Sequence, residues 1–186
     1  MSKLQNAWIE TYSSIRFYPL SPKIEDINIR DIIHSLSNQC RYTGHCSTFY
    51  SIAQHCVLGA KLFLRDKKKN LAKAFLLHDA CEAYLCDLSA PVKQLMPEYR
   101  KAEEVLDKLI ALRFDLEYPW AKEVTEMDMR MRYFEAHSLG FHHVASWQLP
   151  VIPTFELVID PWNPNYAKRC FLEFYIELFG LKYGKI

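Results

Sequence analysis

The chain has 186 residues, of which 50% are hydrophobic and 14% aromatic, and a formal net charge of +1 at pH 7. This length suits one domain with a sizeable core, so we predict a single domain over 1–186. The near-neutral charge argues against binding along a nucleic acid, which needs a clear basic excess. It permits a small anionic ligand held by one or two cations in a pocket.

The cysteines and the N-terminus indicate a cellular compartment. No two of the six cysteines have a Cys-x-x-Cys spacing, and we interpret them as reduced thiols of an intracellular protein. The first ten residues lack the apolar stretch of a signal peptide, and no apolar run approaches the length that crosses a bilayer. We therefore predict a cytoplasmic protein with no membrane partner.

Apolar residues recur at helical spacing through most of the chain, which predicts an all-α fold of about six or seven helices. Ser47, Thr48 and Asn70 are placed to cap helices, and Pro97 and Pro119 stand where a first helical turn accepts proline. In chain order, the six clearest helices cover about 27–36, 47–63, 70–84, 97–114, 120–141 and 163–180.

The segments between these helices contain glycine and proline, which predicts loops and extended pieces. Residues 15–20 alternate weakly and predict a short strand or an extended lid. We expect a loop over 38–46 and a second one over 87–95, which contains Pro91. A proline-broken stretch precedes the C-terminal helix, and within it we expect 154–159 to be extended.

The dipeptide His78-Asp79 stands inside the apolar run of the third predicted helix. Burying an imidazole beside a carboxylate among leucines costs free energy unless both groups are paired or bind a metal. Neighbouring helical residues point about 100° apart, so both side chains reach one small object only if it lies between their directions. For the dipeptide alone, a satisfied core pair or an exposed turn is the alternative. His55 and Asp128, each in its own predicted helix, favour a metal site.

These positions give four candidate metal ligands: His55, His78, Asp79 and Asp128. Helical bundles build metal sites from side chains of different helices that converge in the interior. Two imidazoles and two carboxylates leave positions for water and substrate on a six-coordinate ion, as catalysis requires. Mixed nitrogen and oxygen ligands suit one divalent transition metal ion (Mn, Fe, Co, Ni or Zn) better than Mg or Ca.

The order His…His-Asp…Asp resembles the HD-domain superfamily of metal-dependent phosphohydrolases. Two segments carry the likeness, YSIAQH over 50–55 and LLHDACEAYLCDLSAPVK over 76–93, and RYTGH over 41–45 also fits. They are similar to a group of small bacterial and phage enzymes that includes the YfbR-like 5′-deoxynucleotidases and the phage DatZ-type dATP triphosphohydrolases. The resemblance covers roughly 27–137 and implies an HD-type helical bundle, with its core over about 27–141, around a mononuclear metal site.

The resemblance implies a role for each matching residue. It makes the four candidates the metal ligands, assigns acid–base chemistry to Glu82 and Asp87, and gives phosphate binding to Arg41 and Lys93. One turn after His78, Glu82 is near enough to take a proton from the attacking water without filling a coordination position. The alternative for Arg41 and Lys93 is ordinary surface charge.

Further positions near the motifs have more than one interpretation. Tyr42 is placed to bind substrate by stacking on a base, or to pack beneath the loop. His45 is placed to touch a phosphate oxygen, or to cap the following helix. Relatives in the resembled group often carry a lysine where this chain has Thr125, and Lys122, one turn earlier, is its candidate substitute. Glu135 lies on the helical face of the last ligand, and we interpret it as a structural partner of the site.

The expected reaction is hydrolysis of a phosphate ester of a deoxynucleoside monophosphate or triphosphate, with water as the nucleophile. The expected partner is therefore a small-molecule nucleotide, and the likeness to this group suggests a homo-oligomer. Two other classes remain open: a non-catalytic nucleotide-sensing HD module, and a structural metalloprotein whose His and Cys side chains clamp zinc. Turnover separates an enzyme from the first class, and unfolding by chelators identifies the second.

Overall fold

A computed structural model describes residues 7–147 and 157–180 and confirms the all-α prediction. Within these residues lie six helices of nine residues or more and two shorter ones, together with one small antiparallel strand pair, β1 (Ile9–Glu10) and β2 (Arg16–Phe17). The helices are α1 (Ile29–Asn38), α2 (Ile52–Arg65), α3 (Lys69–Leu77), α4 (Glu82–Leu85), α5 (Ala90–Gln94), α6 (Pro97–Arg113), α7 (Lys122–Ser138) and α8 (Pro164–Phe179). Short 3-10 turns form η2 (Ile24–Asp26), η3 (Tyr42–Gly44) and η4 (Val144–Ser146).

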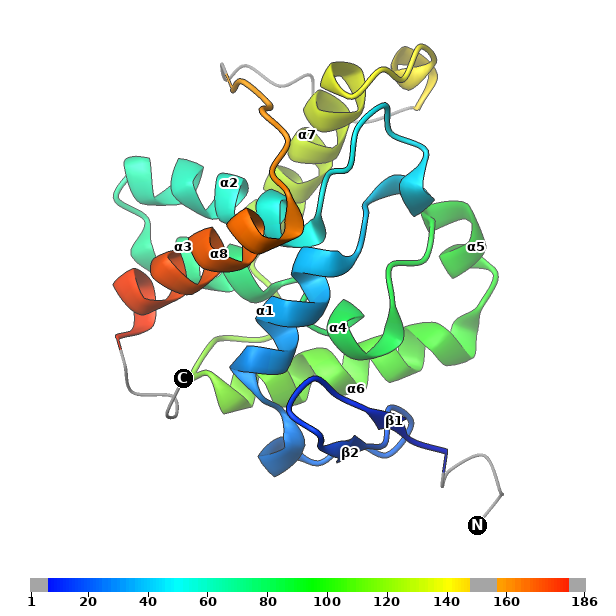
Figure 1. Cartoon of the computed structure of the whole chain (residues 1–186), viewed down its shortest axis with the longest axis vertical. Coiled ribbons are helices and arrows are strands. Elements are labelled where there is room, and N and C mark those ends of the chain that lie inside the picture. The colour runs from blue at the N-terminus through cyan, green and yellow to red at the C-terminus, as the bar shows by residue number, and fades with distance from the viewer. Residues whose placement is uncertain (1–6, 148–156, 181–186) are drawn as a thin grey trace.

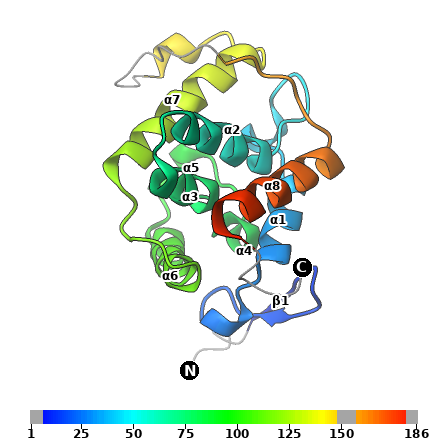
Figure 2. The ribbon, with the colours of Figure 1, turned by 90° about the vertical axis from the view of Figure 1, so that its left-hand side faces the viewer.

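Helix α2 occupies the centre of the fold. It packs against α1, α3, α7 and α8, and Figure 1 and Figure 2 show α8 lying along α2 and α3. Ile52, Ala53 and Val57 of α2 are fully buried, and so is Phe171 of α8. Burial of this apolar surface is the main stabilising contribution to the fold, and it makes α2 a rigid support for the polar residues that it also carries.

Gly59 permits the close approach of α2 and α3. A Cβ atom built on Gly59 would overlap the ring of Phe75, which is fully buried. We therefore expect Gly59→Ala to lower the free energy of unfolding by about 1–3 kcal/mol, the usual cost of overpacking a core. Urea unfolding measures this loss. Phe75→Leu in the same chain should recover part of it, and strictly additive losses in the double variant would contradict the contact.

The prediction of one continuous helix over 70–84 is wrong. Helix α3 ends at Leu77 and α4 begins at Glu82. In the turn between them, the backbone N–H of Glu82 donates to the carbonyl of Asp79 at 3.0 Å. This bond spans three residues and closes a tighter turn than the four-residue bond of an α-helix. His78 and Asp79 therefore lie in the turn that joins the two helices, and His78 keeps the backbone angles of a helix (φ −65°, ψ −31°).

Three other predicted boundaries are also wrong. Asn70 is not a cap, because α3 begins one residue before it, at Lys69. Ser51 caps α2, in place of Ser47 or Thr48, because residues 40 and 51 form an isolated antiparallel bridge that keeps the preceding segment extended. Pro91 lies in the first turn of α5 rather than in a loop, since its missing N–H costs nothing there.

Starts marked by proline agree better with the structure. Helix α6 begins at Pro97, and α8 begins at Pro164 with the side chain of Asn163 as its cap. Helix α7 begins at Lys122, two residues after its predicted start. Of the segment predicted to be extended, 154–156 lie outside the described residues, and 157–159 are neither helix nor strand. Among the described helices, none combines the length and apolar character needed to cross a lipid bilayer.

Candidate metal centre

Three separate parts of the chain bring the four predicted ligands together. His55 comes from α2, Asp128 from α7, and His78 and Asp79 from the turn after α3; α7 passes beside α2 and α3 (Figure 2). His55 Nε2 lies 3.2 Å from Asp128 Oδ1 and 3.7 Å from Asp79 Oδ2. His78 Nε2 lies 3.1 Å from Asp79 Oδ1 and 3.8 Å from Asp128 Oδ1. Two nitrogens and two carboxylates therefore meet in one small volume.

The other nitrogen of each imidazole already has a partner. His78 Nδ1 donates to the carbonyl of Phe75 at 2.7 Å, and His55 Nδ1 donates to the carboxylate of Glu135 at 2.8 Å. With Nδ1 as the donor in each ring, Nε2 faces carboxylate oxygens, and neither Nε2 has a hydrogen-bond partner among the described residues. A cation between these atoms satisfies them all, so the donor set fits a divalent transition metal ion.

The charges of the cluster also favour a cation. Burial raises the pKa of Asp128, but the facing imidazoles of His55 and His78 outweigh burial and hold this pKa well below its usual range. Burial lowers the pKa of His78, whereas Asp79 and Asp128 raise it to well above its ordinary value. Imidazoles that hold protons this firmly between carboxylates form a site in which a metal ion can take the place of those protons.

Cys56 is a neighbouring sulfur that the sequence analysis did not single out. In the described part of the chain, two groups of ligand atoms lie within 4.8 Å of one another: His55, His78 and Asp128, and Cys56, His78 and Asp79. A cysteine at an apolar helical position reads as a small core residue, so the sequence holds no signal for it. Burial raises the pKa of the Cys56 thiol to about 11, which disfavours a thiolate ligand.

Glu135 contacts Tyr50, His55 and Arg41, which agrees with its interpretation as a structural partner of the site. Its side chain is fully buried. Oε1 accepts hydrogen bonds from the Tyr50 hydroxyl at 2.7 Å and from His55 Nδ1 at 2.8 Å, and Oε2 lies 3.2 Å from Arg41 Nε. Burial raises the pKa of Glu135, but His55 and Arg41 lower it below its ordinary value. The ionised carboxylate orients His55 so that Nε2 faces the other ligands.

Arg41 is not a surface charge, because only 7% of it is exposed. Its Nη1 lies 3.5 Å from Asp79 Oδ2, and its Nη2 lies 4.0 Å from Asp128 Oδ1. Together with its contact to Glu135, these distances place the guanidinium against three carboxylates of the site. Arg41 therefore stands beside the candidate ligands, where the sequence prediction needs a phosphate-binding cation.

Glu82 and Lys93 lie together next to the ligand cluster. Glu82 is buried, and its Oε1 lies 3.6 Å from Lys93 Nζ. Burial raises the pKa of Glu82 well above its usual value, and the carboxylates of Asp79 and Asp87 raise it further. Lys93 Nζ also lies 2.6 Å from the carboxylate of Glu103 on α6. The sequence analysis missed Glu103, because the residue pattern of 97–113 does not show which side of this helix faces Lys93.

The environment of Tyr42 supports its packing interpretation. Its ring centroid lies 5.0 Å from that of Phe141 and 6.4 Å from that of Trp147. Its hydroxyl donates to the carbonyl of Arg132 at 2.8 Å, which ties the loop of η3 to α7. A base-stacking role for Tyr42 stays a prediction, and it would require the ring to leave these contacts.

His45 and Lys122 lie apart from the cluster. His45 is exposed on the loop after η3, and it does not cap α2, because Ser51 does. Its phosphate contact stays a prediction. Lys122 Nζ lies 3.1 Å from Glu126, and 87% of the Lys122 side chain is exposed. Its substitution for a lysine of the site stays a prediction.

Asp107 on α6 is a half-buried acid whose charge interacts with those of Asp79 and His78. Its Oδ1 is buried without a hydrogen-bond partner among the described residues. Burial raises the pKa of Asp107 to about 7, although the thiol of Cys81 opposes the rise. An unfolded aspartate titrates near 3.9, so between about pH 4 and 7 the native chain binds one more proton than the unfolded chain. The free energy of unfolding therefore falls as the pH rises through this window.

Asp107→Asn is expected to remove this fall. Between pH 5 and pH 8, the wild-type chain should lose roughly 2–3 kcal/mol more stability than the variant does, because only the wild type gives up the proton. Urea unfolding at both pH values, with a chelator present, measures the difference. Stability curves that run parallel for the two proteins would show that Asp107 titrates normally.

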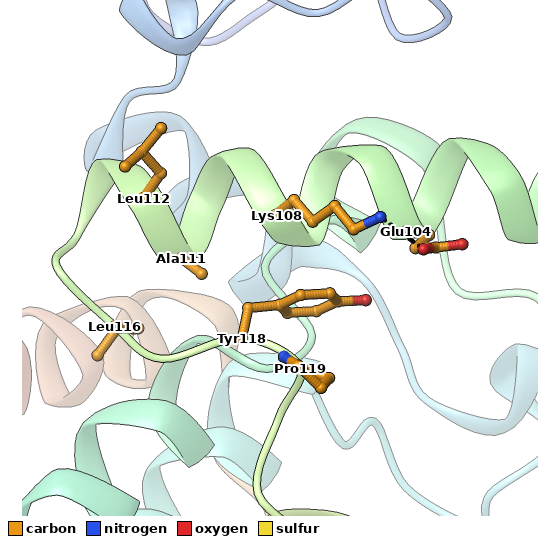
Figure 3. Close-up of a pocket in the computed structure, with 7 residues that line it drawn as sticks. All are labelled: Glu104, Lys108, Ala111, Leu112, Leu116, Tyr118 and Pro119. Carbon is orange, nitrogen blue, oxygen red and sulfur yellow. Dashed lines mark hydrogen bonds and ion pairs between the residues drawn. The ribbon is translucent and has the colours of Figure 1, made fainter.

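A groove of about 510 Å³ lies in another part of the molecule, between α6 and the turn that contains Tyr118 and Pro119 (Figure 3). Figure 3 shows the Tyr118 ring beneath α6, near the ion pair of Lys108 and Glu104, with Leu112 at the far end. None of the predicted site residues lines this groove. The candidate centre is therefore defined by its donor atoms and not by cavity size.

Comparison with known proteins identifies relatives of this all-α chain. No protein-family model matches the chain. It is 37% identical over 178 residues to the uncharacterized protein YfdR of Escherichia coli (strain K12), across 95% of this chain and 98% of YfdR. An uncharacterized protein of Rhodobacter capsulatus is 34% identical over 119 residues, or 61% of each chain. The chain belongs to the family of YfdR.

Proposed function

We propose that the chain is an HD-type metal-dependent phosphohydrolase that hydrolyses a phosphate ester of a deoxynucleoside mono- or triphosphate. The observation that carries the proposal is the convergence of two imidazole Nε2 atoms and two carboxylates, with each Nδ1 held by a separate acceptor. The same residues stand in the order His…His-Asp…Asp, within the segments 50–55 and 76–93 that resemble the HD superfamily.

One divalent transition metal ion, Mn, Fe, Co, Ni or Zn, fits this donor set. It would be held by His55, His78, Asp79 and Asp128. When bound, such an ion supplies Lewis acidity that lowers the pKa of a water molecule and polarises a phosphoryl oxygen. The Asp79 and Asp128 side chains are 17% and 29% exposed, so substrate reaches the cluster from their side.

Glu82 is the proton acceptor in this proposal. Its raised pKa, caused by burial and by Asp79 and Asp87, suits a base that acts near neutral pH. Lys93 limits the rise, since its ammonium group lies 3.6 Å from the carboxylate. Asp87 follows α4, where its backbone N–H donates to Gln39 at 3.3 Å, and its own pKa is raised by burial. In this proposal Asp87 is the acid that protonates the departing oxygen.

Arg41 and Lys93 bind the phosphoryl group. Arg41 already lies within 4.0 Å of both carboxylate ligands, so a phosphoryl group beside those ligands meets its Nη atoms. Lys93 approaches from α5, on the side of Glu82. Two cations on either side of the reacting phosphorus neutralise the charge that develops on its oxygens.

The test is a turnover screen of deoxy- and ribonucleoside mono-, di- and triphosphates with each divalent ion, with products separated by chromatography. Inorganic phosphate from monophosphates alone identifies a nucleotidase, and intact tripolyphosphate identifies a triphosphohydrolase. Glu82→Gln should abolish turnover and retain the metal. Glu98→Gln is the matched control, because 84% of the Glu98 side chain is exposed. Stoichiometric nucleotide binding without turnover in every ion would overturn the proposal in favour of a nucleotide sensor.

A further inference from the structure

Cys40 and Cys46 stand on either side of the loop that carries Arg41. Their Sγ atoms lie 3.5 Å apart, and both residues are half-buried. A disulfide needs a separation of about 2.05 Å, so the two sulfurs are within about 1.5 Å of bonding distance. In residues 7–147 and 157–180, a sulfur–sulfur contact joins this pair alone.

The backbone holds both cysteines in this arrangement. Cys40 forms an isolated antiparallel bridge with Ser51. On the other side of the loop, the N–H of Ser47 donates to the carbonyl of Leu139 at 2.9 Å. Between these anchors, residues 42–44 have φ angles of 56°, 54° and 77°, which turn the chain back sharply. The two thiols are therefore kept as neighbours by the fold around them.

We propose that Cys40 and Cys46 are an oxidative modification site, which a hydroperoxide converts to an intramolecular disulfide. The sulfur of Cys40 attacks one peroxide oxygen, the O–O bond breaks, and a sulfenic acid and one water form. The sulfur of Cys46 then attacks the sulfenic sulfur, the S–S bond forms, and the S–O bond breaks as a second water leaves with the thiol proton. Two thiols lose two electrons, and one hydrogen peroxide is reduced to two waters.

Burial and the neighbouring thiol of Cys40 raise the pKa of Cys46 to about 11. The scheme gives the first step to Cys40 and the resolving step to Cys46, and exchanging the two roles yields the same disulfide. Cys86 is exposed but lacks a partner sulfur among the described residues, so it forms no internal disulfide.

The disulfide acts on the candidate metal centre through Arg41. Cys46 Sγ lies 3.9 Å from the carbonyl oxygen of Arg41, so closing the S–S bond moves the peptide that carries the guanidinium. That guanidinium lies 3.5 Å from Asp79. We expect oxidation to lower turnover by about tenfold to 100-fold, the effect of a displacement near 1 Å in a reacting site, and reductant to restore it. This consequence rests on the proposed function, whereas the disulfide itself does not.

Peptide mapping tests the site directly. The reduced full-length protein is treated with one equivalent of hydrogen peroxide and weighed intact before and after alkylation. We expect a loss of about 2 Da before alkylation, and four alkylated thiols instead of six after it. Trypsin cleaves after Arg41, between the two cysteines, so the peptides 31–41 and 42–61 should stay linked until they are reduced. A Cys56→Ser background assigns the linkage, since Cys56 lies in the second peptide.

Three single variants decide the outcome. Cys40→Ser and Cys46→Ser should each abolish the linked peptide, and Cys86→Ser should retain it. Oxidation of Cys86 ahead of the pair, or an unchanged thiol count, overturns the proposal. A linkage that forms in a protein without turnover in either redox state keeps the modification site and refutes the proposed hydrolase. Equal turnover of linked and reduced protein refutes the effect on Arg41.

Discussion

Asp128→Asn is expected to weaken divalent metal binding by at least about 100-fold and to remove the proposed turnover with it. Loss of an outer partner of a ligand already costs about 10–100-fold in metal affinity, and loss of a carboxylate ligand costs more. Asparagine keeps the size of the side chain but lacks the negative charge that lies 3.2 Å from His55 Nε2 and 3.8 Å from His78 Nε2. Calorimetric titration of metal-free protein with Mn²⁺ or Co²⁺ measures the loss.

Two cysteine variants control this experiment. Cys81→Ala should leave metal affinity largely unchanged, because its thiol faces Asp107 rather than the ligand cluster. Cys56→Ser examines the second group of ligand atoms, in which Cys56 stands with His78 and Asp79. Metal loss in Cys56→Ser, together with full affinity in Asp128→Asn, would establish a thiolate site and contradict the nitrogen and oxygen ligand set.

Two helix starts marked by local chemistry agree with the sequence prediction, whereas Asn70 does not cap α3 and Pro119 lies before the first turn of α7. Pro97 and Asn163 mark the starts of α6 and α8 because proline and an amide cap act within one turn. The start of α2 depends on the bridge between residues 40 and 51, which join across a loop that no local pattern announces. The break after Leu77 is a tight turn closed by the bond from the Glu82 N–H to the Asp79 carbonyl, and no glycine or proline in the sequence marks it.

The residues of the candidate site likewise fall into those that the sequence motifs identify and those that only helix packing brings to the site. Residue type and order are sufficient to single out the four candidate ligands that the structure brings together, and a seven-residue spacing from Asp128 places Glu135 on the same face of α7. Contacts between elements without a shared motif escape such reasoning. Glu103 reaches Lys93 from α6, and Cys56 reaches the ligands from within an apolar helix. Both depend on how whole helices pack, which periodicity does not specify.

Glu135→Ala is expected to lower the free energy of unfolding by about 3–5 kcal/mol, because it removes the nearest of the three carboxylates around a buried cation and the shared acceptor of two buried donors. The variant removes the acceptor of the Tyr50 hydroxyl and of His55 Nδ1, and it strips Arg41 of its 3.2 Å contact. In a chain of this length the thermal midpoint should fall by roughly 6–20 °C. Thermal unfolding followed by circular dichroism measures the shift.

Glu135→Gln separates charge from volume in this prediction. Its amide oxygen still accepts from Tyr50, but the negative charge opposite Arg41 is gone, so its midpoint should lie between those of the wild type and Glu135→Ala. Glu104→Gln, in the exposed pair with Lys108, should leave the midpoint unchanged. Metal affinity should fall in both Glu135 variants, since His55 then loses the carboxylate that orients its ring. A destabilised Glu135→Ala chain that binds metal as tightly as the wild type would mean that Glu135 supports Arg41 alone.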